Sequence, residues 1–112
     1  MKKVIAGVSL SLICLSGMAA TYTKEQLNSM VGAGNYPEQG ETRVVDSKPM
    51  VFEDCKNAAS NMFSAISAHY PVRTAVDSSL LYIGKAWTND GVVMVTCSEP
   101  DKKMIVSQSS YK

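Results

Sequence analysis

The chain has 112 residues, of which 46% are hydrophobic and 19% charged, and its eleven Lys and Arg nearly balance ten Asp and Glu. A chain of this length suits one small domain. The formal net charge is +1, and Lys102-Lys103 is the only adjacent basic pair after the first twenty residues. We therefore expect no nucleic-acid binding, because such affinity depends on many neutralised phosphates.

The first twenty residues have the order of a secretory signal peptide, with a basic start, an apolar middle and a small-residue end. Lys2 and Lys3 are followed by an apolar stretch over residues 4–15 and by the small residues of 16–20. The apolar stretch is shorter than the ~20 residues that cross a bilayer. We expect cleavage after Ala19 or Ala20, no membrane anchor afterwards, and a bacterial protein that is periplasmic or secreted.

Cleavage would remove Cys14 and leave Cys55 and Cys97 in the mature chain. Two cysteines in an exported protein most simply form one disulfide. Their separation does not fit a C-x-x-C redox motif, and short-spaced metal ligands are absent. We therefore predict a Cys55–Cys97 disulfide, no metal and no cofactor. Loss of Lys2 and Lys3 leaves nine basic against ten acidic residues, a net charge of −1.

Residues 21–41 are predicted to be loosely ordered around one short helix. Thr23 and Gln26 match a capping box, which starts a helix over about 24–31. Gly32 and Gly34 stop this helix, and residues 35–40 have the composition of a loop.

The domain itself is predicted over residues 42–112, and it begins with short β-type runs at 42–46 and 50–52. Pro49 lies between the two runs and cannot donate to a central sheet ladder. The pattern indicates either one broken edge strand or one short strand before the next helix.

An amphipathic helix is predicted over about 54–69, because apolar residues recur there with helical spacing. Cys55 lies in its first turn on the apolar face, so the helix should dock on the element that carries Cys97. The apolar positions are Cys55, Ala58, Ala59, Met62, Phe63 and Ile66.

Three strands are predicted after the helix, over 80–88, 92–98 and 103–109, joined by turns at 89–91 and 99–102. If Asn89-Asp90-Gly91 forms a three-residue loop, the face toward the helix comprises Leu81, Ile83, Trp87, Val93, Val95, Cys97 and Ile105. A two-residue loop would shift the register and exchange the faces.

The opposite sheet face is then too apolar to remain in water, and it is the candidate interaction face. Its candidate residues are Tyr82, Val92, Met94, Thr96, Met104 and Val106. Either residues 21–50 fold over this face, or a partner covers it. The partner would be another envelope or secreted protein, or a second copy in a homodimer.

The sequence contains no residue pattern typical of a catalytic site. His69 would end the helix and fits a capping role, whereas a base needs a nucleophile or bound water within reach. Glu53 and Asp54 are sequence neighbours, so they cannot flank a glycosidic bond from two sides. We expect no catalytic residues and no enzyme activity.

The sequence predicts an α+β domain with one amphipathic helix on a three- to four-stranded antiparallel sheet, in the order β-α-β-β-β, with one disulfide. The expected function is a non-enzymatic module that binds another protein. The alternative is a small-ligand or cell-wall-binding domain that uses Trp87 and Tyr82.

Overall fold

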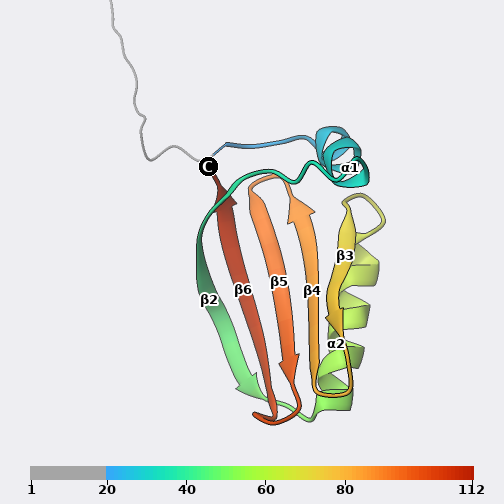
Figure 1. Ribbon diagram of the computed structural model, residues 1–112, viewed down its shortest axis with the longest axis vertical. Helices are drawn as coiled ribbons and strands as arrows, with labels where there is room; N and C mark the ends of the chain where they lie inside the picture. The colour runs from blue at the N-terminus through green and yellow to red at the C-terminus, as the bar shows by residue number, and fades with distance from the viewer. Residues whose placement is uncertain (1–19) are drawn as a thin grey trace, which may run out of the picture.

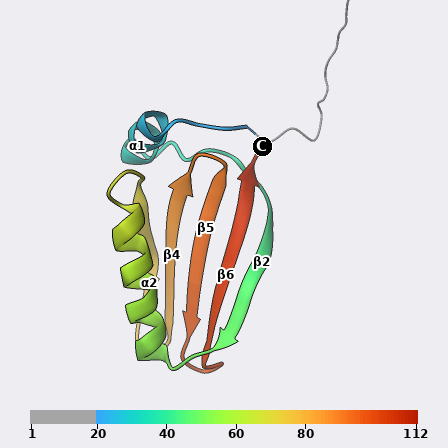
Figure 2. The same ribbon diagram turned by 180° about the vertical axis from the view of Figure 1, so that it is seen from behind.

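A computed structural model describes residues 20–112 of the chain. The signal peptide predicted for residues 1–20 lies outside the described residues except for Ala20, and so does Cys14. One main helix packs against a five-stranded antiparallel sheet, and a shorter helix lies at one end of the sheet (Figures 1 and 2). The α+β class is confirmed, and the sheet has more strands than the expected three to four.

The sheet has the strand order β2-β6-β5-β4-β3, so the first strand pairs with the last. The elements are α1 (Lys24–Gly32), β2 (Gln39–Pro49), α2 (Phe52–Ile66), β3 (Val72–Asp77), β4 (Leu81–Thr88), β5 (Gly91–Ser98) and β6 (Lys103–Tyr111).

Helix α1 starts with the predicted capping box. The Thr23 hydroxyl accepts from the amide of Gln26 at 3.1 Å, and the Gln26 side chain accepts from the amide of Thr23 at 2.8 Å. The helix buries Leu27 and Val31, which pack with Trp87 and Tyr111 at one end of the sheet. Local capping and a short apolar stripe therefore place α1 over that end.

Helix α2 begins at Phe52 and ends at Ile66, earlier at both ends than the predicted 54–69. Its buried residues are Cys55, Ala59 and Phe63, all from the predicted apolar face. Glu53 and Asp54 lie in the first turn, where carboxylates stabilise the positive end of the helix dipole. The predicted face is correct. After Ile66 the chain continues as a hydrogen-bonded turn, in which the amides of His69 and Tyr70 donate to the Ile66 carbonyl, before Pro71.

The predicted disulfide is present. Cys55 and Cys97 have Cα atoms 5.8 Å apart, and both side chains are fully buried. The bond joins the first turn of α2 to Cys97 near the end of β5, so the helix is fixed covalently to the central strand of the sheet.

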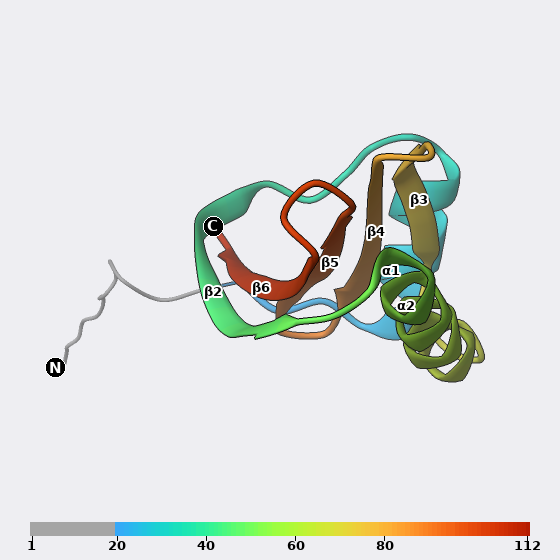
Figure 3. The same ribbon diagram turned by 90° about the horizontal axis from the view of Figure 1, so that it is seen from below.

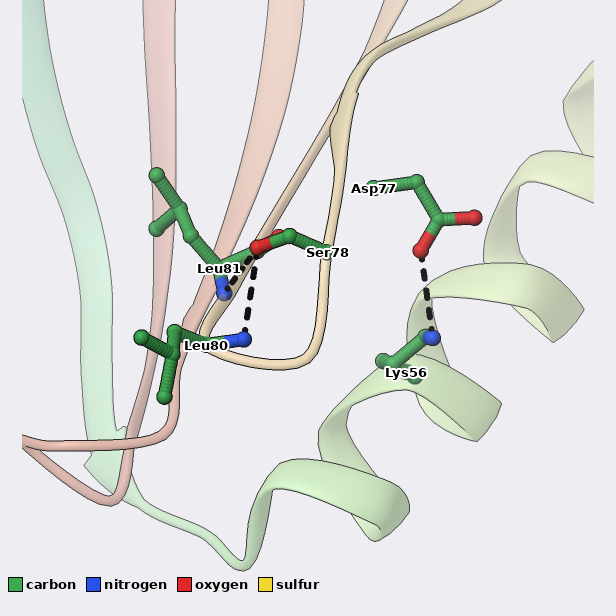
Figure 4. A network of polar contacts seen from close by, with 5 residues as sticks. All are labelled: Lys56, Asp77, Ser78, Leu80 and Leu81. Carbon is green, nitrogen blue, oxygen red and sulfur yellow. Dashed lines mark hydrogen bonds and ion pairs between the residues drawn. The ribbon is translucent and has the colours of Figure 1, made fainter.

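Strand β3 is the element that the sequence analysis missed. Only Val72 and Val76 are partly buried in it, and a register shift between Thr74 and Val76 breaks the period-two pattern. The Ser78 hydroxyl accepts from the amides of Leu80 and Leu81 in the following turn, while Lys56 of α2 pairs with Asp77 at 3.2 Å (Figure 4). These contacts hold an edge strand that has little apolar content.

Strand β2 is one continuous edge strand that ends at Pro49, where a missing donor costs no ladder bond to a further strand. Two register shifts interrupt its pairing with β6, between Gln39 and Thr42 and between Val44 and Asp46. The separate run predicted at 50–52 is not a strand, because Phe52 already belongs to α2.

The β4–β5 hairpin has a two-residue loop, Asn89-Asp90, with Thr88 paired to Gly91. The predicted three-residue loop was wrong. Asn89 is held from outside the hairpin, because its side-chain amide donates to the Tyr22 carbonyl and its oxygen accepts from the Tyr70 hydroxyl. Gly91 has no positive φ; it is needed because a Cβ there would collide with the Ser109 carbonyl.

The two-residue loop reverses the predicted faces of β4. Tyr82, Gly84 and Ala86 lie opposite Cys97, Val95 and Val93, so these six residues share the helix side. On β6, Met104 and Val106 join them, because Met104 pairs with Cys97 and Val106 with Val95. The predicted helix-side positions of Leu81, Ile83, Trp87 and Ile105 were therefore wrong, whereas those of Val93, Val95 and Cys97 were correct.

The sheet is curved, and its concave face lies opposite α2 (Figure 3). The segment between α1 and β2 crosses the concave face at one end of the strands (Figures 1 and 3). Over the rest of the concave face, the described residues provide no second layer.

Candidate functional site: the open face of the sheet

We define the open face as the sheet surface opposite α2. Cross-strand pairing gives its rows, in which directly paired residues point to the same side. These rows are Thr42–Ser109–Val92–Trp87, Val44–Ser107–Met94–Lys85–Arg73, Ser47–Ile105–Thr96–Ile83–Val76 and Pro49–Lys103–Ser98–Leu81.

One end of the open face is closed by the N-terminal segment. Trp87 is only 4% exposed, and the ring of Tyr36 stacks on it with centroids 5.3 Å apart and an interplanar angle of 24°. Leu27 and Val31 of α1 pack against the same cluster. In the first row, Ser109, Val92 and Trp87 are therefore buried, and most of the accessible surface lies in the other three rows.

The N-terminal segment is also tied to the last strand. Tyr111 packs edge-to-face against Tyr22 at 4.9 Å, and its hydroxyl donates to the carbonyl of Thr88 at 2.7 Å. Burial raises the pKa of Tyr111 well above its usual value, with smaller contributions from Tyr22 and Asp90. The hydroxyl is thus a neutral structural donor that closes this end of the sheet.

The centre of the open face is apolar and partly exposed. Ile83, Met94 and Ile105 occupy adjacent strands and each keeps intermediate exposure, as does Leu81 at the far end. Val44, on the edge strand, is 62% exposed. Met94, Lys85, Ser107 and Thr42 also line a shallow hollow of about 140 Å³ beside this centre. This apolar surface is therefore the candidate interaction site.

Cations flank this apolar centre on two sides. Lys85 and Arg73 are direct cross-strand partners in the second row, and Lys103 lies in the last row. None of the three forms an ion pair with any residue in 20–112. The four rows contain no Asp or Glu; Asp101, in the β5–β6 turn, accepts from Ser98 at the rim at 3.1 Å.

The six residues predicted as one interaction face are divided between two faces. Val92, Met94 and Thr96 lie on the open face, although Val92 is buried beneath the N-terminal segment. Met104 is buried in the core under α2, and Tyr82 and Val106 pack against that core. The β4–β5 loop explains the error for Tyr82, because one residue of register reverses the side on which each β4 side chain lies. Met104 and Val106 lie on the helix side because the β5–β6 turn pairs Ser98 with Lys103, which brings Met104 opposite Cys97 and Val106 opposite Val95.

Lys85, Arg73 and Lys103 were missed as functional candidates. The alternation of β4 contained a usable signal, because Lys85 has the same parity as Ile83 and Trp87 and must share their face. Arg73 could not be assigned to the open face from the sequence, because it lies in β3, a strand that was not predicted.

Trp87 and Tyr82 do not form a common platform. Trp87 lies on the open face beneath Tyr36, whereas Tyr82 lies on the helix side and packs against the core. The Trp87 indole nitrogen is buried and has no hydrogen-bond partner among the described residues.

The ionisable residues His69, Glu53 and Asp54 do not lie close together. His69 is exposed in the turn after α2, and its carbonyl accepts from the Asn28 side chain at 3.0 Å. Glu53 and Asp54 lie at the other end of that helix and are exposed. Within residues 20–112, no cluster of three or more His, Cys, Asp or Glu could hold a metal ion.

A second hollow, of about 570 Å³, lies on the helix side near the β4–β5 loop, lined chiefly by β2, β5 and β6. Its lining has mixed charge, with Glu41 and Asp90 alongside Arg43. The hollow has no apolar centre comparable to that of the open face, so it is the weaker candidate for a docking surface.

Comparison with known proteins found no matching family model, no matching curated protein and no matching solved structure. In the part of the chain that the structure describes, no helix has the length and hydropathy needed to cross a membrane.

Proposed function

We propose that this protein is a small exported, non-enzymatic module that binds another protein through the open face of its sheet. The observation that carries the proposal is the uncovered apolar centre formed by Ile83, Met94 and Ile105. In a sheet packed on one side only, such a centre is normally covered by a second layer. A partner protein would supply that layer.

The export part of the proposal rests on two supports. The order of residues 1–20 is that of a signal peptide, and the Cys55–Cys97 disulfide is compatible with an oxidising compartment. We place the mature protein in the bacterial periplasm or outside the cell.

Site-specific photocrosslinking in the producing bacterium tests the binding surface. A photoreactive amino acid is placed at Ile83, at Met94, or at Ala65 on the exposed side of α2 as the matched control. We expect Ile83 and Met94 to give the same crosslinked product and Ala65 to give none. Equal products from all three positions, or none from the open face, would overturn the proposal.

A substitution pair then separates binding from folding. Met94→Asp with Ile105→Asp should abolish the crosslink that forms from Ile83, because two carboxylates would be buried at the interface without partners. The circular dichroism spectrum should stay unchanged, since both side chains are partly exposed in the unbound protein.

A further inference from the structure

We propose that the open face recognises an acidic polypeptide, that is, a protein segment with apolar side chains flanked by carboxylates. This inference rests on the proposed function and adds the chemistry of the partner. It follows from the charges on the open face, from one unfavourable cross-strand pair and from the curvature of the sheet.

The charge distribution of the domain is asymmetric. Residues 21–112 carry a net charge of −1, yet the open face holds Arg73, Lys85 and Lys103 with no carboxylate in its four rows. The ion pairs of the described residues all involve other cations, Lys48, Lys56 and Lys102. The open-face cations therefore remain available to carboxylates from outside.

Arg73 and Lys85 make an unfavourable pair. They are direct partners across β3 and β4, and like charges in that position destabilise a sheet. The Arg73 guanidinium donates to the carbonyl of Val72 at 2.9 Å, which satisfies a donor but does not neutralise the charge. A carboxylate bound between the two cations would remove the repulsion, so binding should be strongest for an acidic segment.

Two other occupants fit this surface less well. A second copy would bring the same three cations against themselves across a two-fold axis, because such an interface uses one patch twice. An anionic bilayer is flat, whereas the sheet face to which the register assigns the apolar centre is concave (Figure 3). A single polypeptide segment can enter the concavity and reach both the apolar centre and the cations.

Direct binding measurements test the inference with the oxidised protein purified from the periplasm. The probes are two fluorescent amphipathic peptides of equal length, one of Leu and Glu and one with every Glu replaced by Lys. Vesicles of phosphatidylglycerol are the third probe. We expect the Leu/Glu peptide to bind, the Leu/Lys peptide not to bind, and added salt to weaken the complex.

Matched variants locate the charge effect. Lys85→Glu should weaken binding of the Leu/Glu peptide about tenfold or more, since a carboxylate would replace the attracting cation. Arg43→Glu is the control, because Arg43 is an exposed cation of the same sheet on the opposite face. Lys85→Glu should also raise the midpoint of thermal unfolding, because the new carboxylate would lie opposite Arg73. A loss of binding in this variant could then not be attributed to unfolding. Arg73→Glu provides an independent repeat.

The outcomes separate this inference from the proposed function. If Met94→Ser abolishes peptide binding while Lys85→Glu binds normally, the acidic-partner inference is overturned and the protein-binding surface stands. Normal binding by both variants overturns both. Equal binding of the two peptides, absence of binding by either, or preference for the vesicles overturns the acidic-polypeptide assignment.

Discussion

The ring of Phe63 lies directly against the backbone of Gly84. A Cβ at position 84 would come within 2.5 Å of the Phe63 ring edge and within 2.8 Å of the Tyr82 hydroxyl oxygen. Gly84 is buried in β4 beneath α2, and Phe63 is 5% exposed. The absence of a side chain at this strand position therefore sets how closely α2 approaches the sheet.

Gly84→Ala should destabilise the protein by about 1–3 kcal/mol, because the added methyl group overpacks the helix–sheet interface. The measurement is urea unfolding followed by circular dichroism. Phe63→Leu removes the ring edge, so the double variant should lose less stability than the sum of the two single variants. Additive losses would contradict the contact.

Replacing both Cys55 and Cys97 with Ser should lower the free energy of unfolding by about 4 kcal/mol, the loop-entropy value for this sequence separation of 42. In a small domain this is a large share of the total stability. Urea unfolding of the oxidised protein and the double variant measures the loss. Similar unfolding midpoints would contradict a stabilising role for the bond.

Trp87 should emit at short wavelength and resist quenching by acrylamide, because its side chain is buried under Tyr36 and α1. Tyr36→Ala removes the stacked ring and should shift the emission to longer wavelength. Tyr82→Phe is the control, since Tyr82 lies on the other side of the sheet and should leave the emission unchanged. An emission maximum typical of solvent-exposed Trp in the unmodified protein would contradict the packing.

The raised pKa of Tyr111 predicts loss of stability at high pH. Above the unfolded-state value of about 10, the unfolded chain releases the phenolic proton while the folded protein keeps it. The folded state then binds more protons, so stability is complete below pH about 10 and falls as pH rises further. Unfolding titrations between neutral and strongly alkaline pH measure this slope.

Tyr111→Phe gives the matched comparison. It should cost about 1 kcal/mol at neutral pH, because the hydrogen bonds to the Thr88 and Gly91 carbonyls are lost. It should also reduce the alkaline loss of stability. An unchanged alkaline slope would show that Tyr111 is not the responsible group.

The oxidised protein should be monomeric at micromolar concentrations in light scattering. Like charges oppose pairing of two open faces, and the exposed edge of β2 carries register shifts, Lys48 and Pro49, which hinder strand addition. A dimer would instead indicate association through the edge of β2. Val45→Lys should then dissociate it, because Val45 is exposed and lies beside one register shift.

Local patterns account for the elements that could be predicted. Thr23 and Gln26 specify the start of α1 through bonds within one turn, and the helical spacing of Cys55, Ala59 and Phe63 identifies the buried face of α2. Only two of the three cysteines lie outside the predicted signal peptide, and two cysteines leave one simple pairing. Each of these inferences needs only neighbouring residues or elimination.

The candidate site could not be predicted to the same degree, because it depends on register. Asn89 is fixed by bonds to Tyr22 and Tyr70, which lie far away in sequence, and those bonds accompany the two-residue loop Asn89-Asp90. That difference moved Ile83 and Lys85 to the open face and Tyr82 to the core. Strand β3, with its irregular apolar spacing, becomes a strand only when β4 is beside it.

The sequence by itself determined the α+β class, the capped first helix, the buried stripe of α2 and the disulfide, because helical periodicity, capping and cysteine count are local or exhaustive signals. Tertiary structure alone decided the fifth strand, the side of the sheet on which each β4 and β6 residue lies, and the gathering of Arg73, Lys85 and Lys103 around an apolar centre. The physical reason is the two-residue period of a β-strand. A shift of one residue costs little locally but reverses a whole face, and only long-range contacts select between the two arrangements.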